Sequence, residues 1–255
     1  MNNETTLEKR IYDFEQEYCK FMEIDSFPEY RIEKIHRDSQ KTIVKAQAYY
    51  DFDGMEQVLI IPDNIELSRS TMFHEFTHIL DDEYYEGKNR RSNFLLHGYS
   101  EYHAAQIQLL DLVGANSINL DSFHFSMNNK CADFNTVTDY IKDRKSLFIE
   151  YINKMSVPTN METARTIIGM LFNYLGFVSI CKSYSIDYID INEDELFSRF
   201  NDDITLDLKK LMNSAWLDYN MTKVLDTFET YRKIISPLIR DKDKELLARR
   251  GIFLF

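Results

Sequence analysis

The chain has 255 residues, of which 44% are hydrophobic and 14% aromatic, and it carries a formal net charge of −12. This composition is too apolar for an intrinsically disordered chain, and the acidic balance argues against general nucleic-acid binding, which needs lysine and arginine against phosphates. Only seven glycines and four prolines are available for tight turns, so we expect helices to dominate.

Cysteine usage and the amino terminus indicate the compartment. Cys19, Cys131 and Cys181 are widely spaced and form no CxxC pair, so neither a disulfide framework nor a cysteine-rich zinc site is predicted. The amino terminus lacks the basic-then-apolar layout of a signal peptide. No uninterrupted apolar run approaches the roughly 18 residues of a membrane span. We therefore expect a cytoplasmic protein with no membrane segment.

The first 62 residues predict one helix followed by three strands. Apolar residues recur at three- and four-residue steps over 4–24, which is typical of a helix. The β-branched and aromatic segments 30–35, 42–50 and 57–62 predict strands. We expect a small antiparallel sheet that packs against the next helix. Its edge strand could pair with an extended peptide.

The segment 72–82 carries His74, Glu75 and His78 in the HExxH spacing. Residues four apart lie on one face of a helix, so both imidazoles can bind the same zinc ion. Glu75 is then close enough to the open side of the metal to accept a proton from bound water without being a ligand. An ordinary surface turn is the alternative, but the apolar residues within the segment favour a packed helix. The spacing therefore predicts a zinc-dependent hydrolase, most often a peptidase.

A second helix is expected over 100–114, after a polar loop within 83–99. Ser100 is a candidate N-cap and Gly114 a candidate stop signal. A catalytic zinc commonly takes three protein ligands and keeps one position for water. Glu101, at the start of this helix, is the preferred third ligand. The alternative for Glu101 is an ordinary first-turn carboxylate that the helix dipole favours.

Other residues compete for the third position or for supporting roles. The alternative ligands are His97, His103 and the Asp81/Asp82 pair. Asp81 could instead orient a ligand imidazole through the free N–H of its ring. His103 is turned about 200° from Glu101 around the helix. We therefore predict that it reaches over the cleft as a catalytic hydrogen-bond donor to the transition state.

Two tyrosines, Tyr99 and Tyr102, are alternatives to His103 as the donor to the oxyanion. A phenolic hydroxyl, like an imidazole N–H, can stabilise negative charge that develops on the substrate oxygen. The residues do not decide among the three.

The combination of a sheet, an HExxH helix and a following helix that opens with glutamate resembles the gluzincin group of zinc metallopeptidases. The run Glu101-Tyr102-His103-Ala104 is similar to the second motif of ImmA/IrrE-type peptidases, which reads approximately ExxA followed by Asn or Asp. Position 105 is Ala, so the usual polar residue is missing there. The resemblance covers about residues 30–115. It implies a zinc-dependent intracellular peptidase that acts on a helix-turn-helix repressor.

The HExxH segment also looks like the catalytic helix of anthrax-lethal-factor-like peptidases, because Asp81 and Asp82 follow His78. Those peptidases are mostly secreted, and the missing signal peptide argues against that branch.

The remaining 140 or so residues are predicted to be helical. Apolar periodicity predicts helices over 137–155, 161–184, 196–216 and 221–250, the last interrupted at Ser236-Pro237. The apolar end, 251–255, is expected to dock on the core. We divide the chain into a zincin-like domain over 1–118 and a helical bundle region over 119–255 that packs on it.

The sequence thus predicts an α+β protein that acts as a zinc metallopeptidase on a protein or peptide. His74, His78 and Glu101 hold Zn²⁺, with Glu75 as general base. The alternative is a helical interaction or regulatory protein in which the metal motif is structural or vestigial. The substrate specificity and the oligomeric state stay open.

Overall fold

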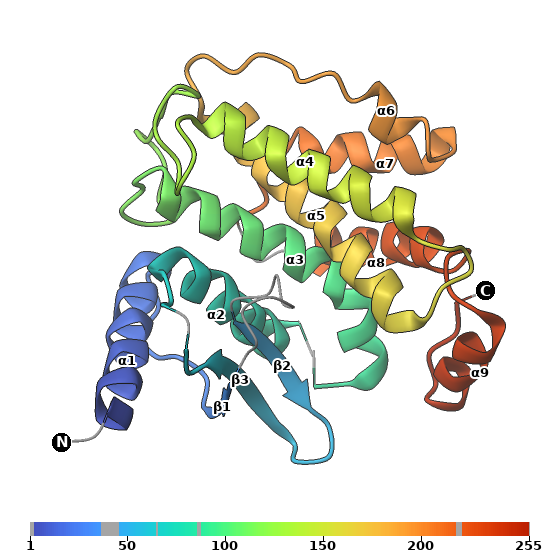
Figure 1. The fold of residues 1–255 in the computed structure, drawn as a ribbon, viewed down its shortest axis with the longest axis horizontal. Helices are drawn as coiled ribbons and strands as arrows, with labels where there is room; N and C mark the ends of the chain where they lie inside the picture. The colour runs from blue at the N-terminus through green and yellow to red at the C-terminus, as the bar shows by residue number, and fades with distance from the viewer. Residues whose placement is uncertain (1–2, 37–45, 65, 86–87, 218–220, 255) are drawn as a thin grey trace.

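The computed structural model describes residues 3–36, 46–64, 66–85, 88–217 and 221–254. Over these residues the fold is α+β, with one three-stranded sheet, nine helices and a mostly helical C-terminal half (Figure 1), so the predicted class is confirmed. The helices are α1 (Asn3–Met22), α2 (Arg69–Tyr84), α3 (Arg90–Leu112), α4 (Val137–Lys154), α5 (Met161–Tyr184), α6 (Asp194–Phe197), α7 (Asp202–Met212), α8 (Met221–Ile235) and α9 (Asp241–Arg249).

The sheet contains β1 (Tyr30–Ile35), β2 (Gln47–Asp51) and β3 (Glu56–Pro62) in the order β1-β3-β2. β2 and β3 pair antiparallel, but β1 pairs parallel to β3. The prediction of a purely antiparallel sheet is therefore wrong. It assumed that each strand pairs with the next, whereas β3, the most apolar strand, takes the central position and is flanked on both sides. Residues 42–45 of the second predicted strand lie outside the described residues.

Helix α2 forms where the HExxH spacing predicts it. The Ser68 hydroxyl accepts a hydrogen bond from the backbone N–H of Thr71 at 3.2 Å and so caps its start. One side of α2 packs on α1, where the Tyr18 ring meets Phe73 edge-on with centroids 5.2 Å apart. The Tyr18 hydroxyl also bonds Thr77 at 3.0 Å. These contacts turn the opposite side of α2 towards β2 and α3 (Figure 1).

Helix α3 begins ten residues earlier than predicted. The side chain of Asn89 accepts hydrogen bonds from the backbone N–H groups of Arg91 and Ser92, which makes Asn89 the N-cap. The polar loop predicted within 83–99 therefore ends by Arg90, where α3 begins, and Ser100 lies inside the helix rather than at its start. Gly98 does not end or begin an element. A Cβ at Gly98 would come within 2.7 Å of the Tyr231 ring, so glycine is needed here for close packing.

Helix α5 packs directly on α3 and so joins the C-terminal half of the chain to the first half. A Cβ at Gly176 would lie 2.2 Å from the carbonyl oxygen of Tyr102, so the two helix backbones approach closely here. The Gln106 amide also donates to the Ser179 hydroxyl across this contact at 2.7 Å. Among the described helices, only α5 has the length and apolar composition of a membrane span, and 78% of its most apolar window is buried inside the protein.

The last third of the chain departs from the predicted boundaries in detail. The single helix expected over 196–216 is divided into α6 and α7, and the interruption at Ser236-Pro237 separates α8 from α9. Ile252 and Leu254 are buried, which confirms that the apolar end docks on the core at these two positions. Within the described residues, most of the core is one cluster that extends from Ile11 to Leu254, and a second, small cluster contains Tyr85, Leu96, Tyr99 and Val224. The division at residue 118 stays a prediction.

Candidate metal centre

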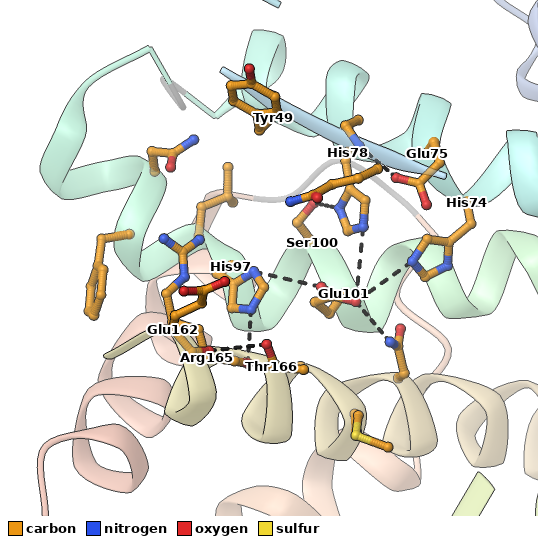
Figure 2. Close-up of a pocket in the computed structure, with 18 of the residues that line it drawn as sticks. Tyr49, His74, Glu75, His78, His97, Ser100, Glu101, Glu162, Arg165 and Thr166 are labelled. Carbon is orange, nitrogen blue, oxygen red and sulfur yellow. Dashed lines mark hydrogen bonds and ion pairs between the residues drawn. The ribbon is translucent and has the colours of Figure 1, made fainter. Parts of the chain in front are cut away.

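Helices α2 and α3 bring together the three predicted ligands, His74, His78 and Glu101. One ligand atom from each lies within 4.8 Å of the others. The Oε2 atom of Glu101 is 3.6 Å from Nε2 of His74 and 3.9 Å from Nε2 of His78. Figure 2 shows both imidazoles turned towards this carboxylate. The group could hold a metal ion.

The chemistry of these donors fits a metal better than it fits a simple ion pair. Two imidazole nitrogens and one carboxylate oxygen form a common set of protein ligands for catalytic zinc. The three side chains are only 13–18% exposed and they line the same pocket. An unprotonated imidazole nitrogen and a carboxylate oxygen both offer lone pairs, so a cation bound between them would give each of these ligand atoms a partner.

Two further side chains orient the ligands. The Ser100 hydroxyl bonds Nδ1 of His78 at 2.7 Å, which leaves Nε2 of that ring facing Glu101. The side-chain amide of Asn173, on α5, donates to Oε2 of Glu101 at 2.8 Å. Ala105 has no polar side chain to offer, and the polar contact to Glu101 comes from Asn173 on a different helix. Nothing in the local sequence around Glu101 points to Asn173.

The protonation of the centre reflects burial and mutual contact. Burial lowers the pKa of His78 to about 3, so its imidazole is neutral. Burial also acts to lower the pKa of His74, but the Glu101 carboxylate outweighs this and the net shift is upward. Burial would raise the pKa of Glu101, yet the neighbouring imidazoles hold it well below the ordinary value. Two of the three ligands are thus in the metal-binding form near neutral pH, and a metal must displace any proton on His74.

Glu75 lies between the metal cluster and the edge strand of the sheet. It is 7% exposed and lines the pocket. Its Oε2 atom accepts a hydrogen bond from the backbone N–H of Ala48, on β2, at 2.7 Å. The predicted general base is therefore beside the ligands without belonging to the ligand cluster (Figure 2).

His97, an alternative ligand, contacts the centre without joining the cluster. It lies one turn before Glu101 on α3, and its Nδ1 is 3.7 Å from Oε1 of Glu101. Its Nε2 is 3.2 Å from the carbonyl oxygen of Arg165. Burial lowers the pKa of His97 to about 4. We interpret it as a neutral neighbour of Glu101 whose Nε2–H donates to the carbonyl oxygen of Arg165.

The prediction that His103 reaches over the cleft is wrong. His103 is completely buried and does not line the pocket. Its Nδ1 is 2.8 Å from Oδ1 of Asp81, which is also completely buried. The 200° rotation around α3 turns this side chain away from the pocket and towards α2. Tyr99 and Tyr102 are buried as well, so the predicted oxyanion donors all lie behind the site.

Asp81 contacts His103 and not a ligand imidazole. Burial raises the pKa of Asp81, and the neighbouring His103 and Ser100 side chains oppose that rise. Ser100 itself bonds Nδ1 of His78, so it lies near both Asp81 and a ligand. The predicted contact between Asp81 and a ligand imidazole is therefore wrong.

The site opens into a pocket of about 920 Å³. β2 forms one wall, and α5 forms the opposite wall with Glu162, Arg165 and Thr166 (Figure 2). Side chains of α2, α3, α4 and the C-terminal segment complete the lining. This volume is large enough for several residues of a peptide.

Comparisons of the chain with protein-family models, with curated proteins and with solved structures give no match. What the centre does must therefore be argued from its own residues.

The structure adds two α5 residues to the site that the sequence did not single out. Asn173 and Arg165 belong to a helix that we predicted only as a central bundle helix. A local signal was present, since Gly169 and Asn173 interrupt an otherwise apolar face at a four-residue spacing. The sequence alone does not show that this interruption faces Glu101.

Proposed function

We propose that this protein is a zinc-dependent metallopeptidase. The observation that carries the proposal is the convergence of His74, His78 and Glu101 on a pocket wall, with the Glu75 carboxylate beside them. A ligand cluster, an adjacent base and an open pocket are the three parts that metal-assisted hydrolysis requires.

Zinc is the metal that suits these ligands best, because two imidazoles and one carboxylate with an open position are typical of hydrolytic zinc sites. When bound, zinc would polarise the substrate carbonyl and lower the pKa of a water molecule.

Glu75 would act as the general base and then as the general acid. A carboxylate beside the ligands can accept a proton from the attacking water and pass it to the leaving amine. The Ala48 N–H bonds Oε2 of Glu75 at 2.7 Å and so restrains this carboxylate at the pocket. An oriented base loses less entropy on reaching the transition state.

Within the described residues, no strand pairs with the edge of β2 that faces away from β3, and this edge supports a peptide as the substrate. β2 is an outer strand, and residues 46–50 line the pocket. The Ala48 N–H faces Glu75 rather than β3, so the backbone groups of Ala48 and of Tyr50, two residues on, lie at this free edge. An extended peptide could add to this edge and bring its scissile bond to the metal centre.

The expected compartment and the sequence resemblance indicate which proteins could be the substrate. We propose an intracellular protein, in line with the expected cytoplasmic location. The resemblance of the Glu101 motif to ImmA/IrrE-type peptidases makes a helix-turn-helix repressor the first candidate to examine.

The first experiment measures metal content and cleavage in matched variants. Wild type and Glu75→Gln should each bind one zinc, and Glu101→Ala should lose it. Glu162→Gln is the control, because this carboxylate lines the same pocket outside the ligand cluster. Glu75→Gln should reduce cleavage about 10²- to 10⁴-fold with zinc retained, measured by mass spectrometry on a peptide library.

Two results would contradict the proposal. A wild-type protein that binds no zinc after reconstitution would leave the helical interaction protein as the explanation. A Glu75→Gln variant with full activity would show that another residue is the base.

A further inference from the structure

The pocket lining is rich in arginine, although the chain as a whole is strongly acidic. Four arginines and no lysine line the described pocket: Arg90, Arg144, Arg165 and Arg250. Guanidinium groups bind carboxylates in a planar, two-pronged geometry that lysine cannot provide. The lining therefore points to an anionic group on the ligand.

The four arginines differ in whether a carboxylate of the protein already neutralises them. Arg90 pairs with Asp53 at 3.1 Å, and Arg144 pairs with Asp143 at 2.7 Å. Within the described part of the chain, neither Arg165 nor Arg250 has a carboxylate oxygen within 4 Å. Arg250 is exposed near the C-terminal end, whereas Arg165 is half-buried in the wall of the pocket.

Arg165 is held in the pocket wall by an aromatic contact rather than by an ion pair. Its guanidinium carbon lies 5.5 Å from the centre of the Phe94 ring, which restrains the side chain without neutralising its charge. Its carbonyl oxygen is bonded by His97. A partly buried cation held by an aromatic ring has lost rotational freedom before a ligand arrives, so binding a carboxylate costs less entropy.

The position of Arg165 along α5 relates it to the metal centre. Gly169, one helical turn further on, is where α5 touches the ligand: a Cβ there would be 3.2 Å from Oε1 of Glu101. One turn advances about 5.4 Å along the helix, and an extended peptide advances about 3.3 Å per residue. A group bound by Arg165 would therefore lie one or two residues from the scissile bond.

No carboxylate of the pocket lies within ion-pair distance of Arg165, although its charge acts on Asp82 from further away. Glu75, Asp82, Glu101 and Glu162 all line the pocket, but none forms an ion pair with Arg165. Glu101 belongs to the metal cluster and Glu75 is held by Ala48. Asp82 accepts a hydrogen bond from Asn93 at 3.1 Å. Glu162 is exposed at the rim.

We propose that Arg165 is a specificity residue that binds a carboxylate of the peptide substrate, one or two residues from the scissile bond. The carboxylate is either an acidic side chain or the C-terminal carboxylate of the peptide. This subsite rests on the proposed peptidase function, since it defines which peptides that centre accepts.

The test uses metal-loaded Glu75→Gln protein, which binds peptides without turning them over. The probes are fluorescent peptide libraries with an amidated C-terminus and either Glu or Gln fixed near the centre. A third library has no acidic residue and a free C-terminal carboxylate. The expected result is that the Glu library or the free-carboxylate library binds at least about tenfold more tightly than the amidated Gln library. Whichever library binds more tightly identifies the source of the carboxylate.

Arg165→Gln in the Glu75→Gln background should abolish this preference. Arg165→Glu should reverse it, so that an amidated library with Lys fixed near the centre binds most tightly. The matched control is Arg91→Gln, because Arg91 is exposed at the start of α3 and lies outside the pocket. The control should leave the preference unchanged. Zinc content is measured in every variant, so a damaged metal centre would be recognised.

Equal binding of all three libraries to the Glu75→Gln protein with Arg165 intact would overturn the subsite. A preference that survives the added Arg165→Gln change would also overturn it. Neither result concerns the peptidase itself, which wild-type cleavage of the same libraries tests separately. Zinc-loaded wild type that binds the Glu library through Arg165 and cleaves none of the libraries would instead contradict the proposed function.

Discussion

Two assemblies of histidine and carboxylate connect α2 to α3, and they differ in almost everything except residue type. In the metal centre, Glu101 of α3 faces His74 and His78 of α2, with side chains 13–18% exposed at the pocket. In the buried pair, His103 of α3 faces Asp81 of α2, and both side chains are completely buried. The first is accessible to a ligand and the second is not.

The comparison shows that location and the number of donors decide what such a group can do. The buried pair has one imidazole for one carboxylate, joined by a single contact of 2.8 Å, and Oδ2 of Asp81 has no hydrogen-bond partner among the described residues. Removing one member of such a pair costs more stability than the intact pair contributes. The metal centre brings two imidazoles, with His97 behind them, to one carboxylate at an open surface. That excess of donors favours a cation. Ser100 lies near both assemblies, because it bonds His78 and opposes the rise in the pKa of Asp81.

The largest effect should come from breaking the buried pair. His103→Ala leaves the buried Asp81 carboxyl without its imidazole partner, and we expect the metal-free protein to lose about 3–5 kcal/mol of unfolding free energy. Urea denaturation measures this loss. His74→Ala is the matched change in the metal centre and should cost clearly less in the metal-free protein while removing metal binding. Equal losses for the two variants would mean that the two assemblies do not differ in this way.

Two glycines of α5 extend the comparison to helix packing. Gly176→Ala places a Cβ against the backbone of α3 at Tyr102, which must shift, so we expect a loss of about 1–3 kcal/mol. At Gly169 a Cβ meets only side-chain atoms of Glu101 and His97, at 3.2–3.3 Å. Gly169→Ala should therefore weaken metal binding with little loss of stability. Denaturation and metal titration of both variants give the answer, and a reversed pattern would contradict it.

The Ser100 hydroxyl allows the connection between the assemblies to be measured. Ser100→Ala frees Nδ1 of the His78 ring, and we expect the metal affinity to fall about 10- to 100-fold, as for other residues that orient ligands. Metal titration against a chelator of known affinity measures the change. Ser92→Ala, at the start of the same helix, is a control outside the pocket lining. An unchanged affinity in Ser100→Ala would show that α2 alone orients the ring.

A further effect is a dependence of stability on pH that originates at the metal centre. Burial holds the pKa of His78 at about 3 and that of His97 at about 4 in the folded protein. Both imidazoles take up protons near pH 6.5 when the chain unfolds. Stability should therefore fall as the pH is lowered from 6.5 towards 5, by at most about 1.4 kcal/mol per pH unit for each residue. His74 has the opposite sign, because its raised pKa adds stability that is lost only as the pH rises above 6.5.

Denaturation of the metal-free protein at several pH values between 5 and 6.5 measures this slope, and His97→Asn should reduce it by about half. A slope that is the same in wild type and His97→Asn would contradict the assignment of a neutral imidazole to the folded state.

The sequence by itself determined the part of the site that lies within one helix. His74 and His78 share a face because four residues make slightly more than one turn, whatever the helix packs against. The same local rule gave the correct direction of Glu101 relative to His103, although α3 begins at Arg90 and not at Ser100. A shift in the start of a helix does not change the angle between two of its residues.

Only the tertiary structure decided what faces what between elements. The rotation of α3 against α2 and α5 depends on contacts far apart in the chain, such as Gly176 on Tyr102. That rotation directs His103 into the core and brings Asn173 to Glu101 and Arg165 to the pocket. The central position of β3 likewise follows from burying its apolar residues between two neighbours. Spacing along a helix sets angles within that helix, whereas the relative orientation of two helices depends on how their side chains pack.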